Sequence, residues 1–146
     1  MTTWGTGELP AGWAWAKLGD IADVQLGKML DAKRQTGEHA MRYLRNINVQ
    51  WHRTDLDDLL RMDVAAEERE RYTVRAGDLL VCEGGEPGRC AIVPEAAAGL
   101  AFQKALHRVR PAEGVLPAYL AYLLELMAQT GPVSYTHLTL PTNREV

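Results

Sequence analysis

Alternation of apolar and polar residues recurs over short stretches of the chain and predicts several short β-strands. Trp13 and Trp15 alternate with small residues directly after a Pro/Gly turn. Residues 41–51 end in an alternating apolar pattern, and residues 100–109 alternate before Pro111 interrupts them. We therefore expect strands at these three places, each with one face toward a core.

Two uninterrupted apolar runs, residues 79–82 and 90–93, indicate buried strands. The loop between them, Gly84–Arg89, contains three glycines and a proline and predicts a tight hairpin connection. Residues 27–37 are polar and basic, as is typical of a loop. Short helical turns are expected at three further places: residues 20–24, 55–60 and 65–71.

A longer helix is predicted near the end of the chain. Pro117 suits the first helical position, residues 118–129 are apolar on nearly every side, and Gly131-Pro132 stops the pattern. A helix that is apolar all round is a buried helix. The pattern as a whole favours an α+β fold, a single compact domain of short, mostly antiparallel strands with a late buried helix. We assign six residues to its core: Trp13, Trp15, Leu79, Leu80, Ile92 and Leu123.

Composition agrees with one globular domain. The chain has 146 residues, of which 47% are hydrophobic and 24% charged. No run approaches the ~18 apolar residues that a membrane helix needs, and the first residues lack the basic and apolar regions of a secretory signal. Two cysteines are too few for a disulfide framework. We therefore expect a cytoplasmic protein without a membrane segment.

Charge is unevenly distributed, although the net charge is only −3. Residues 28–53 hold six basic and two acidic side chains, and residues 89–110 hold four basic and one acidic. Between them, residues 55–70 hold seven acidic side chains against two basic ones. A fold that joined the two basic stretches would present a surface to a polyanion. Ordinary solvated faces of mixed charge are the alternative.

Catalytic motifs are mostly absent from the sequence. There is no phosphate-binding Gly-x-x-x-x-Gly-Lys motif and no dinucleotide-binding glycine pattern, and the only serine is Ser134. The four histidines show no metal-ligand spacing. Cys82 and Cys90 are most simply core thiols. A thiol-using or anion-binding catalyst built on them and on the Gly84–Arg89 loop stays an alternative.

Three segments combine groups that contact nucleic acids. In a strand over residues 41–51, Asn46, Asn48 and Gln50 share one face, and amides of this kind pair with adenine. The segment 102–110 repeats the pattern with Gln103 and basic neighbours. Backbone N–H groups and the arginine of the glycine-rich loop can hold a phosphate. Each segment also has a plain reading, as an edge strand, as basic side chains lying over a core, or as a simple turn.

Several blocks of the sequence, in order, carry a resemblance to one known family: Leu9-Pro-Ala-Gly-Trp13 with Lys17-Leu-Gly-Asp-Ile21, Tyr43-Leu-Arg-Asn-Ile-Asn48, Gly77-Asp-Leu-Leu80, Gly84-Gly-Glu-Pro-Gly-Arg89, Phe102-Gln-Lys-Ala-Leu-His-Arg108 and the helix from Pro117 to Leu124. They resemble a target recognition domain of the specificity (HsdS) subunits of type I restriction-modification systems. The resemblance covers residues 9–131 and defines a recognition domain at residues 1–132. Residues 133–146 do not resemble the family's continuation and look like translated adapter or vector sequence; a divergent tail is the alternative.

The resemblance implies a domain that reads a half-site in double-stranded DNA and does no chemistry itself. In this family, methyltransferase (modification) subunits and a restriction subunit are the partners. S-adenosylmethionine, ATP and Mg belong to those partners, so no cofactor is expected in this chain. The family's spacer helix and second recognition domain would follow this segment, so the resemblance implies at most half of a specificity subunit. A protein-interaction module whose late helix and Trp-rich edge dock a partner is the alternative function.

These expectations single out ten residues. The candidate base readers carry amide groups, together with one arginine able to contact either a base or a phosphate: Asn46, Asn48, Gln50, Gln103 and Arg45. The candidate phosphate contacts are basic: Lys28, Arg42, Arg53, Arg89 and Lys104.

Overall fold

A four-stranded antiparallel sheet forms the centre of the molecule. The computed structural model describes residues 9–130 and 139–143. In the sheet, β2 (Ala22–Leu26) pairs with β10 (Leu106–Pro111), β10 with β7 (Leu79–Cys82), and β7 with β8 (Cys90–Ile92). The β7–β8 hairpin lies where the two apolar runs predicted it. Antiparallel strands with one late helix confirm the α+β fold class.

The sheet separates two hydrophobic cores, which is why β7 is buried along its whole length. Leu79 and Val81 point into the core shared with the late helix, whereas Leu80 and Cys82 point into the core on the other side. The period of two along a strand produces this division. A continuous apolar run is therefore what a strand between two cores requires.

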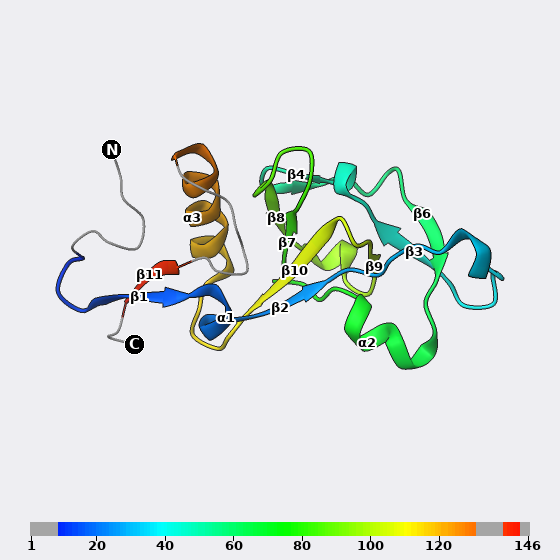
Figure 1. Ribbon diagram of the computed structural model, residues 1–146, viewed down its shortest axis with the longest axis horizontal. Helices are drawn as coiled ribbons and strands as arrows, with labels where there is room; N and C mark the ends of the chain where they lie inside the picture. The colour runs from blue at the N-terminus through cyan, green and yellow to red at the C-terminus, as the bar shows by residue number, and fades with distance from the viewer. Residues whose placement is uncertain (1–8, 131–138, 144–146) are drawn as a thin grey trace.

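The late helix α3 (Pro117–Thr130) packs beside β8, at one end of the molecule (Figure 1). Leu120, Leu124 and Met127 face the core, so the predicted buried helix is confirmed on that side. Its opposite side is largely exposed: Tyr122, whose ring lies 4.7 Å from that of His52, is 64% exposed and Leu126 is 47% exposed. The sequence pattern, apolar nearly all round, overestimated how much of the helix is buried.

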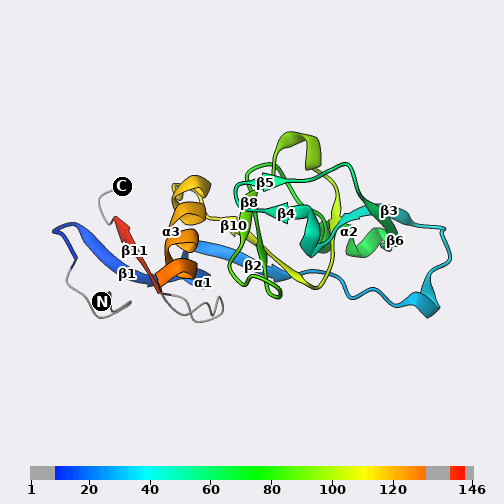
Figure 2. The ribbon, with the colours of Figure 1, turned by 90° about the horizontal axis from the view of Figure 1, so that it is seen from above.

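A second, three-stranded sheet lies at the other end, as both views show (Figures 1 and 2). Its strand β3 (Ala40–Leu44) pairs antiparallel with β6 (Leu60–Asp63) and parallel with β9 (Ala101–Phe102). The short helix α2 (Arg69–Tyr72) follows a 3-10 turn at Ala66–Glu68, and together they match the helical stretch predicted over residues 65–71 to within one residue. Two further 3-10 turns are Ala32–Arg34 and Glu95–Ala97.

The single strand predicted over residues 41–51 is wrong. Strand β3 ends at Leu44, a 3-10 turn follows at Asn46–Asn48, and a small hairpin is formed by β4 (Val49–Gln50) and β5 (Arg53–Thr54). The Asn48 side chain stabilises this turn by accepting a hydrogen bond from the backbone N–H of Arg45 at 2.8 Å. Local side-chain bonding of this kind competes with strand formation.

Other boundaries also differ from the prediction. The first helical turn, α1 (Leu18–Ile21), ends early, and residues 22–24 belong to β2. Residues 57–58 form a bend where a helical turn was expected. The strand expected over residues 100–109 is divided into β9 and β10 by a turn, which redirects the chain from one sheet to the other.

At the N-terminal end, β1 (Trp13–Lys17) pairs antiparallel with β11 (Thr139–Asn143). Five residues of the sequence that looked unlike the family thus pair with the predicted domain, while residues 133–138 and 144–146 lie outside the described residues. Trp13 packs against Tyr119 with ring centroids 6.3 Å apart. Trp13 and Trp15 are only half-buried, which corrects their core assignment. Leu79, Leu80 and Leu123 are buried as predicted, and Ile92 packs against the core.

Candidate nucleic-acid interface

Four segments that carry predicted DNA-contacting residues converge beside the central sheet. The chain leaving β2 is joined to the turn before β10, because the N–H of Lys28 bonds the carbonyl of Phe102 at 3.0 Å and the N–H of Lys104 bonds the carbonyl of Lys28 at 3.0 Å. The N–H of Gln103 bonds Leu44 at 3.0 Å, and the N–H of Glu83 bonds Ala105 at 3.0 Å. We call this surface, built from residues 27–30, 44–48, 83–89 and 103–105, the loop surface.

Gly27 allows the first two segments to approach each other. A Cβ atom at this position would lie 2.1 Å from the carbonyl oxygen of Gln103 and 2.8 Å from the Phe102 ring. Only glycine fits without moving the backbone. Gly27, the first residue of the polar loop, therefore allows that loop to pack against the turn between β9 and β10, which carries Gln103.

The glycine-rich loop is tied to the 44–48 segment through Arg89. Its Nε donates to the carbonyl of Val49 at 2.7 Å, and its Nη2 donates at 3.2 Å to both the carbonyl and the side-chain oxygen of Asn46. Glu86 lies 3.6 Å away as an ion-pair partner. The guanidinium predicted to hold a phosphate thus bonds the protein's own backbone, and the side chain is mostly buried.

Most of the amide groups predicted to read bases bond within the protein. Asn48 is fully buried and donates to the carbonyls of Asp55 at 3.0 Å and Asp58 at 2.9 Å, so the prediction of an exposed Asn48 is wrong. Asn46 donates to Gly84 at 3.2 Å, and Gln50 donates to Ile47 at 2.9 Å. The side-chain amide of Gln103 makes no hydrogen bond with the described residues. It is the amide of this set that is free for an outside ligand.

The predicted basic residues other than Arg89 fall into three groups. Lys28 pairs with Glu68 at 2.6 Å and lies 5.3 Å from the Tyr72 ring centroid, and Arg45 pairs with Asp58 at 3.1 Å. Lys104 is exposed on the loop surface. The remaining two, Arg42 on β3 and Arg53 on β5, are exposed but lie outside the four segments.

A shallow hollow of about 460 Å³ on the loop surface was not predicted from the sequence. It is lined by three apolar and three polar or charged residues: Met29, Leu30, Ala105, Glu83, Gln103 and Lys104. Met29 is 63% exposed and Leu30 is 38% exposed. The signal for this site was present in the sequence as two adjacent apolar residues within a polar and basic loop.

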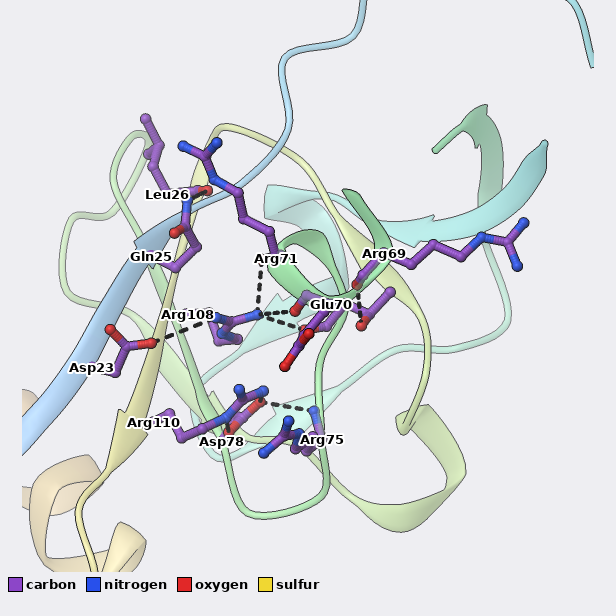
Figure 3. A network of polar contacts seen from close by, with 11 residues as sticks. Asp23, Gln25, Leu26, Arg69, Glu70, Arg71, Arg75, Asp78, Arg108 and Arg110 are labelled. Carbon is purple, nitrogen blue, oxygen red and sulfur yellow. Dashed lines mark hydrogen bonds and ion pairs between the residues drawn. The ribbon is translucent and has the colours of Figure 1, made fainter. Parts of the chain in front are cut away.

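The second basic stretch contributes less to the surface than its charge suggests, because Arg108 is buried (Figure 3). Its Nη1 donates to the carbonyls of Glu70, Arg71 and Thr73 at the end of α2, at 3.4, 2.9 and 2.8 Å. Its guanidinium also lies 5.5 Å from the Phe102 ring centroid. Burial lowers the pKa of Arg108, which acts here as a cap for α2.

Arg110 is held by a buried carboxylate. Its Nε and Nη2 donate to the two oxygens of Asp78 at 2.8 and 2.9 Å, as Figure 3 shows. The hydrogen bond to Asp78 raises the pKa of Arg110. Asp78 also accepts from the backbone N–H of Arg75 at 2.7 Å. Together with Arg89, three of the four basic residues in the 89–110 stretch therefore stabilise the fold.

The two cysteines do not form a common site. Cys82 belongs to the core that contains Phe102, whereas Cys90 belongs to the core beneath α3, on the other side of the sheet. Burial raises the pKa of the Cys90 thiol to about 12 and raises that of Cys82 as well. A protonated, buried thiol is a poor nucleophile. This arrangement favours the interpretation as core thiols over the thiol-using catalyst.

Comparison with solved structures identifies the fold. The HsdS subunit from Thermoanaerobacter tengcongensis matches with a TM-score of 0.71 and 18% identity, over 94% of this chain and 34% of that one. A chain from a structure on complex assembly and conformational transition of the type I R-M system matches with a TM-score of 0.65 and 18% identity, over 94% of this chain and 35% of that chain. The type I restriction-modification S subunit from M. genitalium matches with a TM-score of 0.51 and 12% identity, over 98% of this chain and 38% of that one.

The chain thus has the fold found in part of the specificity subunits of type I restriction-modification systems. It spans about a third of the length of these chains. Comparisons with protein-family models and with curated proteins give no match. Within the described residues, no helix is long and apolar enough to cross a membrane.

Proposed function

We propose that this chain is a target recognition domain of the HsdS family, which binds double-stranded DNA and reads a short half-site. The observation that carries the proposal is the fold shared with specificity subunits across nearly the whole chain. The loop surface supports it, because four segments far apart in sequence are held together there by backbone hydrogen bonds. Recognition groups held by a rigid frame are what sequence reading requires.

The proposal divides the ten predicted residues by what the structure leaves available. Gln103 is the base-reading amide, and Lys104, Arg42 and Arg53 contact phosphates. Arg45, Asn46 and Gln50 lie on or beside the loop surface, and each side chain has at least one partner within the protein. On this proposal they exchange these partners for DNA contacts when DNA is bound. Lys28, Asn48 and Arg89 shape the surface from within.

The domain is proposed to be non-catalytic. On this account it directs methyltransferase (modification) subunits and a restriction subunit to the half-site, and S-adenosylmethionine, ATP and Mg belong to those partners. Assembly of this kind takes place in the cytoplasm, with no membrane partner. The raised pKa of both buried thiols supports this account against catalysis by the cysteines.

Binding to duplex DNA over a range of salt concentrations tests the proposal. Each phosphate contact contributes a slope of about 0.9 to the dependence of log affinity on log salt. Lys104→Ala should weaken binding about equally on all sequences and lower that slope by about one. Lys17→Ala is the matched control, because Lys17 is an exposed lysine on β1 outside the loop surface. Absence of binding at low salt would overturn the proposal.

A protein-interaction module is the second candidate function, and one observation favours it. Ala118, Tyr122 and Leu126 form an exposed, largely apolar stripe along α3 at a spacing of four residues. Stripes of this kind often mark interfaces with a partner. A chain that docks a partner through α3 without reading DNA would show no salt-dependent affinity for duplexes, so the same titration separates the two functions.

A further inference from the structure

We propose that the hollow on the loop surface reads an A·T base pair from the major groove, with Gln103 on the adenine and Met29 and Leu30 on the thymine methyl group. This inference rests on the proposed DNA-binding function and names the chemistry that the site recognises. Its basis is the juxtaposition of an unbonded amide and two exposed apolar side chains in one hollow.

The amide is the first observation. Asn46, Asn48 and Gln50 each bond backbone carbonyls of the protein, whereas the Gln103 side chain makes no such bond with the described residues. Its backbone is held, because the N–H of Gln103 bonds Leu44 at 3.0 Å. A glutamine with a fixed backbone and a free amide can pair with both N6 and N7 of adenine.

The apolar pair is the second observation. Met29 and Leu30 are adjacent in the sequence, line the same hollow and are exposed at 63% and 38%. They follow Lys28, whose backbone bonds both Phe102 and Lys104, so they extend from a backbone segment that is held in place. Gly27 lets this segment approach Gln103, because any side chain at position 27 would collide with the Gln103 carbonyl. The apolar groups are therefore held beside the amide by the fold.

The charges around the hollow indicate a base edge as the occupant. Lys104 and Glu83 both line it, and the Glu83 side chain is exposed. A carboxylate repels a phosphate but accepts a hydrogen bond from the exocyclic amino group of a base. An A·T pair presents an amino group, an acceptor nitrogen and a methyl group in the major groove. The Gln103 amide matches the amino group and the acceptor nitrogen, and the two apolar side chains match the methyl group.

Replacement of thymine by uracil tests this inference, since uracil lacks only the 5-methyl group. The experiment uses the full chain and duplexes that carry the motif enriched from a random pool, with each thymine replaced in turn. At one thymine, the unmodified chain should lose about fourfold in affinity, the effect of one buried methyl group. A Met29→Ala/Leu30→Ala variant should bind the thymine and uracil duplexes with the same affinity at that position. Gln103→Ala should relax the preference for adenine at the same base pair.

Controls keep the outcomes distinct. Leu116→Ala removes a side chain that is 70% exposed just before α3, and it should retain the full uracil effect. An equal uracil effect in the unmodified chain and in the Met29→Ala/Leu30→Ala variant at every thymine overturns this inference and leaves DNA recognition in place. An enriched motif without an A·T pair does the same. A chain that enriches no motif overturns both the inference and the proposed function.

Discussion

Arg89 and Val49, forty residues apart, are joined by a hydrogen bond of 2.7 Å from the guanidinium Nε to the backbone carbonyl. The same side chain also bonds Asn46. It thus connects the glycine-rich loop to the turn between β3 and β4. A residue whose charge suggested a phosphate contact also holds two loops together.

Arg89→Ala should therefore lower the free energy of unfolding. Hydrogen bonds from a charged group are worth about 1.5–3 kcal/mol, and the carbonyls of Val49 and Asn46 would each lose a charged donor. Denaturant unfolding measures the change. Arg89→Lys should not restore stability, because an ammonium group cannot bond both carbonyls in the same fork. Unchanged stability with uniformly weaker DNA binding would show that Arg89 contacts phosphates after all.

Asn48→Ala should destabilise the protein by about 1–3 kcal/mol, because it removes the side-chain donor to the Asp55 carbonyl and one of the two side-chain donors to the Asp58 carbonyl. Thermal unfolding gives the value. Gln50→Ala is the matched control, since Gln50 is less buried and donates a single hydrogen bond to Ile47. A stable Asn48→Ala protein that loses discrimination at one base pair would restore Asn48 as a base reader.

Gly27→Ala should disrupt the loop surface. The added methyl group would lie 2.1 Å from the Gln103 carbonyl oxygen, so the backbone must move, at a cost of about 1–3 kcal/mol. Gly19→Ala, in α1, meets nothing within 4 Å and should leave stability unchanged or slightly improved. Comparison of the two variants by denaturant unfolding checks the prediction. Equal effects would mean that the close approach at Gly27 is not needed.

Asp63 should make the order of the loop over residues 36–39 depend on pH. Its carboxylate accepts hydrogen bonds from the N–H groups of Gly37 at 2.9 Å and His39 at 3.3 Å, and from Thr36. The Gly37 and Thr36 bonds hold the pKa of Asp63 below its ordinary value. The folded pKa is lower than the unfolded one, so the stabilisation is complete above about pH 3.9 and is lost as the pH falls through the folded pKa.

Amide exchange at Gly37 and His39, expressed as protection relative to the unstructured chain, measures this effect. Protection should persist at neutral pH and decline in acid, and Asp63→Asn should remove the dependence. Protection that stays constant into strong acid would contradict the assignment.

Local patterns in the sequence predicted the elements whose environment is decided locally. The β7–β8 hairpin and the start of α3 follow from an apolar run and from Pro117, and the structure has both. Periodicity says which residues are apolar but not what covers them. The exposure of Tyr122 therefore could not be predicted.

Candidate site residues were harder to predict because their partners are distant in sequence. Asn48 bonds residues seven and ten positions away, and Arg108 bonds carbonyls 35–38 positions away. An amide or guanidinium in the sequence gives no indication of whether the fold will use it internally. Gln103 and Lys104 remain available because the turn that carries them lies at the surface between two sheets.

The central claim, that this domain reads DNA sequence, is tested most directly by selection. The full chain would be equilibrated with a randomised duplex pool at several salt concentrations, and the bound DNA would be sequenced. The account predicts enrichment of one short motif, with a preference that Gln103→Ala relaxes at one base pair and that Lys104→Ala leaves unchanged. A bound pool with the same sequence distribution as the input at every salt concentration would contradict it.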